Sequence, residues 1–180
     1  HAAWLVSGRM AALLDSMIHD APTDSDVVLE LEQLARRQGT GLAADDLDGC
    51  WLLNQTWSRE GTASSSFSIG LLRALKACLV LECQSEGLAI ANQVSLGPIR
   101  LRFDGIASLK GRQPLLRFSF ASVRLQVGSL TLLNQSLPEP TRQKQPFFAL
   151  IAQGDQRNWL CARGRGGGLA LWIRSPDNVA

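Results

Sequence analysis

The chain of 180 residues contains no tyrosine, only two histidines and no Gly-x-Ser-x-Gly motif. His1 and His19 both lie near the start, ahead of the region in which strands are expected. Nucleophilic and acid–base catalysis usually need such side chains, so the sequence lacks a recognisable catalytic constellation. We therefore expect that the protein is not an enzyme.

The cysteines also lack the patterns that would give them a metal. They form no C-x-x-C pair and have no neighbouring histidine, so we expect no metal site. Cys78 and Cys83 would lie on opposite faces of one strand, a poor geometry for a bridge. We expect reduced thiols, as in a protein on the cytoplasmic or stromal side of a membrane. The four positions are Cys50, Cys78, Cys83 and Cys161.

Long apolar runs and targeting segments are missing as well. No stretch approaches the ~18 consecutive apolar residues of a membrane-spanning helix. The start of the chain shows neither a basic stretch followed by an apolar core nor an arginine- and serine-rich presequence. We expect a protein that is not secreted and has no transmembrane segment.

Charge is distributed unevenly, although the net charge is only +2. Before Gly49 there are nine acidic side chains and three arginines, whereas the remainder has seven acidic and fifteen basic side chains. Either the acidic part docks on the basic part, or the basic part faces an anionic surface. Because a domain has roughly 150 residues, residues 1–180 are expected to form one domain.

The pattern of apolar residues divides this domain into two parts. From Trp4 to Ile18 and again from Val27 to Ala35, apolar residues recur at spacings of three and four, which predicts helices within residues 1–39. Thr23 and Asp26 resemble a capping box for the second helix, and Gly39 would end it. Residues 49–174 alternate with a period of two and contain frequent turn signals, which predicts an antiparallel sheet or barrel.

The glycine-rich segment Arg163-Gly-Arg-Gly-Gly-Gly168 is compatible with two interpretations. A phosphate-binding loop would need the Walker lysine and a following helix, but an apolar strand-like stretch follows here. We expect a hairpin turn.

Four arginines occupy the polar phase of successive predicted strands. They would gather on one outer face, opposite the apolar residues of the same strands. This face is either an ordinary solvated surface or a patch for an anionic lipid surface or an acidic partner. Nucleic acid is disfavoured because the patch lacks interleaved aromatic residues. The patch residues are Arg100, Arg102, Arg117 and Arg124.

Gly49-Cys50-Trp51 resembles the Gly-x-Trp at the first strand of lipocalins, where the indole plugs the barrel floor and an arginine packs on it. The arginine here would be Arg174 or Arg163, and the alternative is that Trp51 is simply a core residue. A barrel lined by leucine and aromatic residues could hold a long apolar ligand or be filled by its own side chains. The expected interior residues are Trp51, Leu53, Leu101, Phe103, Phe118, Phe120, Leu125 and Trp172.

Across most of its length the chain resembles the plastid lipid-associated protein (fibrillin) family, in particular a cyanobacterial member. The resemblance rests on Asp46-Leu-Asp-Gly-Cys-Trp-Leu-Leu53, Ala91-Asn-Gln-Val94, residues 97–103 and the closing segment from Arg163 to Arg174. It implies a mainly β fold, a lipocalin-like antiparallel β-barrel preceded by a helical hairpin. It also implies binding of a carotenoid, an isoprenoid quinone or another lipid, and peripheral association with thylakoids. The segment Phe148-Ala-Leu-Ile-Ala152 departs from the Tyr-Leu-Asp of many members.

Two alternatives to a lipid-binding protein remain open at this point. One is an accessory enzyme similar to lipocalin-like bilin lyases, which handle a tetrapyrrole chromophore; the absence of tyrosine and of histidine in the barrel speaks against it. The other is a filled barrel that acts as an interaction module in a photosynthetic protein complex.

Overall fold

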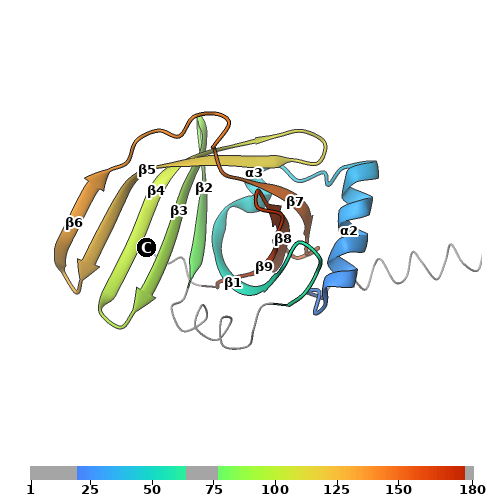
Figure 1. Ribbon diagram of the computed structural model, residues 1–180, viewed down its shortest axis with the longest axis horizontal. Helices are drawn as coiled ribbons and strands as arrows, with labels where there is room; N and C mark the ends of the chain where they lie inside the picture. Colours follow the sequence, from blue (N-terminus) through green and yellow to red (C-terminus); the bar gives the residue numbers. More distant parts are fainter. Residues whose placement is uncertain (1–19, 64–76, 177–180) are drawn as a thin grey trace, which may run out of the picture.

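Antiparallel strands dominate the computed structural model, which describes residues 20–63 and 77–176 (Figure 1). Each strand pairs with at least one neighbour in a single sheet. The strands are β1 (Gly49–Trp57), β2 (Cys78–Gln84), β3 (Gly87–Leu96), β4 (Ile99–Lys110), β5 (Leu115–Val127), β6 (Leu130–Ser136), β7 (Phe147–Gln153), β8 (Trp159–Gly164) and β9 (Leu169–Arg174).

The sheet curls so that its pairings return to their starting point. Its order is β4-β3-β2-β1-β9-β8-β7-β5-β6, and β4 additionally pairs with β5. Eight strands are thus linked in a ring, and β6 extends β5 outside it. The prediction of a mainly β, barrel-like fold is confirmed.

The long strand β5 contains an irregularity that interrupts its alternating pattern. Its apolar residues switch phase between Phe120 and Val123, so the pattern resembles two strands. Asp104 pairs with Ser122 and Gly105 with Phe120, which leaves Ala121 as an extra residue. This bulge absorbs the phase change, and apolar residues before and after it therefore face the same side of the sheet.

The helix α2 (Ser25–Gln38) confirms the second predicted helix and its end at Gly39, which has φ 79°. The capping box from Thr23 was wrong. Asp24 is the N-cap, and its side chain accepts a hydrogen bond from the Val27 N–H at 3.1 Å. The first predicted helix, from Trp4 to Ile18, lies outside the described residues.

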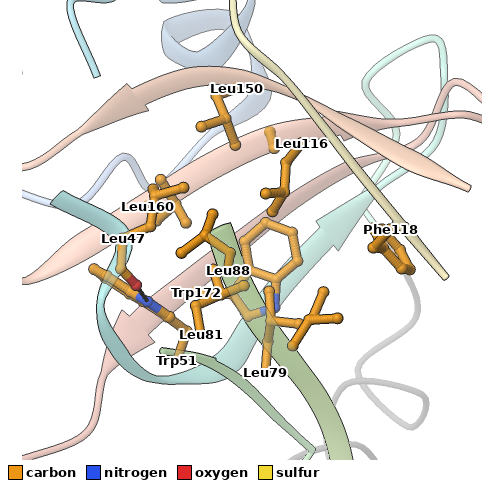
Figure 2. Close-up of a cluster of buried hydrophobic side chains, with 12 residues drawn as sticks. Leu47, Trp51, Leu79, Leu81, Leu88, Leu116, Phe118, Leu150, Leu160 and Trp172 are labelled. Carbon is orange, nitrogen blue, oxygen red and sulfur yellow. Dashed lines mark hydrogen bonds between the residues drawn. The ribbon is translucent and has the colours of Figure 1, made fainter. Parts of the chain in front are cut away.

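Apolar side chains fill one end of the barrel, where the short helix α3 (Ala44–Leu47) lies across the opening. Figure 2 shows Leu47 and Trp51 beside leucines from β2, β3, β5, β7 and β8. The Trp51 indole N–H donates to the Leu47 carbonyl at 2.8 Å, which ties helix to barrel. We call this region the closed end.

The outer face of β7, β8 and β9 is covered by α2 (Figure 1). Val28 and Leu31 of the helix pack there against Trp57, Trp159 and Leu171. The glycine-rich segment joins β8 to β9, and the Gly164 N–H donates to the Gly168 carbonyl at 2.8 Å. The predicted hairpin turn is therefore confirmed.

The expectation of four reduced thiols was wrong for two of them. Cys50 of β1 and Cys78 of β2 form a disulfide between neighbouring strands, with Cα atoms 6.4 Å apart. The disulfide therefore does not join Cys78 to Cys83, the pair that the sequence analysis considered. Cys83 and Cys161 are free.

Within the parts of the chain described above, no helix is long and apolar enough to cross a bilayer.

Candidate ligand cavity and apolar sheet face

A cavity of about 350 Å³ lies inside the barrel, at the opposite end from α3. Its walls are formed by β1, β2, β3, β5, β7 and β9. Its lining is mostly apolar, with Thr56 and Asn92 as the polar side chains. The lining residues are Leu53, Thr56, Ala77, Cys78, Leu79, Asn92, Val94, Phe118, Phe120, Phe148, Ala170 and Trp172.

Aromatic rings line one side of this cavity and continue past it to Phe103 in an unbroken series of contacts. The ring centroids are 5.6 Å apart for Phe103 and Phe120, and 5.5 Å apart for Phe120 and Phe118. Phe148 lies 5.3 Å from Phe118 and 5.1 Å from Trp172. Such separations are typical of favourable aromatic pairs. The series joins four strands, β4, β5, β7 and β9, into one apolar wall.

The predicted interior residues divide into three groups. Leu53, Phe118, Phe120 and Trp172 line the cavity. Trp51 lies in the packed core of the closed end, with no exposed surface. The remaining three share the inner face of the sheet but lie beyond the cavity, in the part where β3 to β6 extend past the barrel (Figure 1). They are Leu101, Phe103 and Leu125.

Beyond the cavity, the register of β3 to β6 aligns apolar residues in rungs across the sheet. Leu96, Ile99, Val127 and Leu130 pair in series, and we call them the tip rung because they flank the two hairpin turns. Two residues further from the turns, a second rung joins Val94, Leu101, Leu125 and Leu133. Val94 also lines the cavity, so the apolar surface continues from the cavity to the hairpin tips.

A second cavity of about 420 Å³ adjoins the first and shares Thr56, Phe148 and Ala170 with it. It lies beside the Gly164 to Gly168 turn and is bordered by Ser58 and Thr62. The two cavities therefore share part of their walls.

Of the two candidate arginines, Arg174 is the one that packs on Trp51 at the floor of the barrel. The Arg174 guanidinium lies over the Trp51 ring, 5.4 Å from its centroid, and donates to the Asp48 carbonyl at 2.6 Å. Gly49 has φ 138°, and a Cβ there would lie 2.9 Å from the Arg174 guanidinium. Glycine at this position therefore leaves room for the arginine on the indole.

Arg163, the other candidate, has a different partner. Its guanidinium makes a two-pronged ion pair with Glu32 of α2, at 2.6 and 2.7 Å. Hydrogen bonds from Arg163 hold the pKa of the buried Glu32 carboxyl below its ordinary value, and they raise the pKa of Arg163. This pair fastens the helix to the outside of the barrel and takes no part in the floor.

The four patch arginines lie on the outer face, but the structure gathers only three of them. Arg102 and Arg124 are direct neighbours across β4 and β5, and Arg100 is two residues away. Arg102 also pairs with Asp104 at 2.8 Å. Arg117 lies near the other end of β5, where its guanidinium covers the Phe147 ring at 5.3 Å.

Several cavity residues escaped the sequence analysis. Phe148 follows another phenylalanine, so strand alternation alone does not tell which of the two points inward. Ala170 and Ala77 are too small to stand out as ligand contacts, and Thr56 follows an irregularity in β1 that shifts its phase. A motif search cannot find such residues, because the barrel geometry assigns their role.

Comparison with known proteins adds a distant structural likeness. No protein-family model matches the chain, and no curated protein matches it. Among solved structures, a solution NMR structure of a protein from Burkholderia xenovorans is similar with a TM-score of 0.39 and 17% identity. The match covers 75% of this chain and 88% of that protein.

Proposed function

We propose that this protein is a non-enzymatic, lipocalin-like binding protein that holds part of a long apolar molecule in the barrel cavity. The observation that supports this most is the continuity between an apolar cavity of about 350 Å³ and the exposed apolar rungs of β3 to β6. A filled core does not need such a surface, whereas a ligand longer than the cavity does.

The size of the cavity supports a partial fit. Ligand sites usually have volumes of roughly 300–1,000 Å³, so this cavity is at the small end of the range. It would enclose a ring or a stretch of chain, and the rest of the molecule would lie along the second rung. Thr56 and Asn92 would orient a hydroxyl or carbonyl group at the cavity wall.

The resemblance to fibrillins supports the ligand class. Under this proposal the ligand is a carotenoid, an isoprenoid quinone or another lipid, and the protein works peripherally at a photosynthetic membrane of a cyanobacterial type. The cavity lining contains no arginine or lysine among the described residues, and such groups would be needed to pair with tetrapyrrole propionates. A lipid is therefore favoured over a bilin.

Energy transfer from tryptophan tests the proposal. A conjugated-polyene fatty acid absorbs where tryptophan emits, so binding in the cavity would quench Trp172 and sensitise the polyene. Because Trp172 lines the cavity, Trp172→Phe should remove a larger share of the sensitised emission than a substitution of a more distant tryptophan. Trp159→Phe is the matched control, because Trp159 is also buried but lies under α2, outside the barrel.

Equal loss of energy transfer in both variants would contradict binding in the cavity. If no apolar probe binds the parent protein, the filled-barrel interaction module becomes the better explanation.

A further inference from the structure

The hairpin tips of β3–β4 and β5–β6 expose apolar side chains next to one another. Among the described residues, six large apolar side chains are exposed, and five of them lie in this region: Leu96, Ile99, Leu130, Leu132 and Leu133. Exposed patches of this kind usually mark a site where a protein, a membrane or a ligand binds.

The charges around the tips indicate which kind of partner binds there. Residues 87–136 contain six basic side chains and a single acidic one, Asp104, which is already paired with Arg102. Arg100 and Arg124 are exposed, and neither forms an ion pair with a described residue. Arg102 faces Arg124 directly across the strands. Like charges in that position repel, so an anionic partner would stabilise them.

The order of apolar and basic side chains along the strands, counted from the hairpin tips, fits the edge of a lipid bilayer. Successive residues along an antiparallel strand are about 3.4 Å apart. Arg100 is one residue above the tip rung, and Arg102 and Arg124 are three residues above it, or about 10 Å. Apolar groups that bind a membrane interface reach about 5–10 Å into it. With the tip rung at that depth, the three guanidinium groups would lie at the level of the phosphates.

We propose that the two hairpin tips dock on an anionic lipid bilayer, with the tip rung inserted and Arg100, Arg102 and Arg124 on the headgroups. A second copy of the chain is a poorer occupant, because it would bring the same excess of positive charge against itself. The apolar rungs would then lead from the bilayer to the cavity. This docking surface uses residues outside the cavity, so it stands or falls separately from ligand binding.

Vesicle flotation with matched aspartate variants tests the insertion. Leu130 and Ile106 are similarly exposed, at 62% and 68%, but Ile106 is on the outer face away from the tips. Both Leu130→Asp and Ile106→Asp add the same negative charge. On phosphatidylglycerol-rich vesicles, Leu130→Asp should lose most of the binding and Ile106→Asp should retain it. Equal loss in the two variants would overturn the proposal.

The arginines are tested with a second matched pair. The double variant Arg100→Gln and Arg124→Gln should bind anionic vesicles roughly thirtyfold more weakly, because each basic residue at such a surface contributes about fivefold. Arg37→Gln with Arg142→Gln removes the same charge from exposed positions elsewhere and should have little effect. Binding of the parent should also weaken as salt rises.

Four controls make the result decisive. Circular dichroism of each variant should match the parent, so that loss of binding is not loss of folding. Ala170→Phe, which fills the cavity, should still float with anionic vesicles even if ligand binding fails. Equal binding to neutral phosphatidylcholine vesicles would overturn the proposal, and so would a parent dimer that Leu130→Asp dissociates and that does not bind vesicles.

Discussion

At the closed end of the barrel, Trp51, Leu81 and Leu160 are almost completely buried, whereas Leu96 and Leu130 at the far end of the same sheet are more than half exposed. Both regions are built from strands with one apolar face. At the closed end, the ring of strands and α3 cover that face. Beyond the cavity, β4, β5 and β6 continue without strands opposite them (Figure 1).

The difference shows that apolar alternation by itself does not tell whether a face is core or contact surface. An apolar face becomes core only where another layer of the structure covers it. In this protein one apolar face continues through both regions: its covered part stabilises the fold, and its uncovered part is exposed, where we propose that a ligand or a membrane binds. Substitutions in the two regions should therefore differ in kind, with loss of stability at one end and loss of binding at the other.

The largest loss of stability is expected from a substitution at the floor of the barrel. Trp51 has no exposed surface, contacts Arg174 and is hydrogen-bonded to Leu47. Trp51→Ala should lower the free energy of unfolding by about 3–5 kcal/mol, the usual cost of removing a large aromatic side chain from a core. Chemical denaturation of parent and variant measures the difference. An unchanged midpoint would show that the closed end does not hold the fold together.

The disulfide should have the next largest effect. Cys50 and Cys78 are 28 residues apart, and closing a loop of that length stabilises a protein by about 3–4 kcal/mol in the chain-entropy model. The denaturation midpoint should therefore fall when a reductant is added. Thiol titration checks the bond itself: denatured, unreduced protein should show two reactive thiols, those of Cys83 and Cys161. Four reactive thiols would contradict it.

Cys161 provides a sharper form of the same titration. Its thiol is completely buried, and burial raises its pKa to about 12. In the folded protein it should stay protonated and unreactive at neutral pH, because the thiolate is the nucleophile. Cys83 is exposed, so native protein should show one reactive thiol, slowed by the hydrogen bond to Asp45 that raises the pKa of Cys83.

A smaller, pH-dependent effect is expected where α2 meets the barrel. Because Arg163 lowers the pKa of Glu32 in the folded state, their interaction stabilises the fold above the unfolded value near 4.5 and is lost as pH falls through the lower folded value. Glu32→Gln should destabilise by about 1.5–3 kcal/mol near neutral pH, the range for hydrogen bonds to charged groups. The difference between parent and variant should shrink on acidification. A constant difference from pH 7 to pH 3 would contradict this role.

The smallest effect on stability should come from the uncovered sheet. Leu130→Ala and Leu132→Ala truncate side chains that are 62% and 57% exposed, and surface substitutions usually change stability by less than about 0.5 kcal/mol. The same denaturation experiment measures them beside Trp51→Ala. A loss of several kcal/mol at either leucine would show that this face is covered after all, and the comparison of the two ends would fail.

How far the sequence leads depends on whether a feature is local. Alternation in β4 and β5, the stop of α2 at Gly39 and the turn after Arg163 are local patterns, and they were predicted. The choice of Arg174 over Arg163 required the register of β1 and β9, since Trp51 pairs directly with Arg174. The bond between Cys50 and Cys78 also depends on which strands become neighbours. Phe148 and Ala170 became cavity residues only once the ring had closed.

The most direct measurement fills the cavity and leaves everything else in place. Ala170 lines the cavity, whereas Ala121 is the exposed extra residue at the bulge of β5. Titration calorimetry with the conjugated-polyene fatty acid would compare Ala170→Phe with Ala121→Phe. We expect Ala121→Phe to bind like the parent and Ala170→Phe to bind at least about tenfold more weakly, because added bulk removes the space that the ligand needs. Equal affinity in the two variants would contradict a ligand inside the barrel.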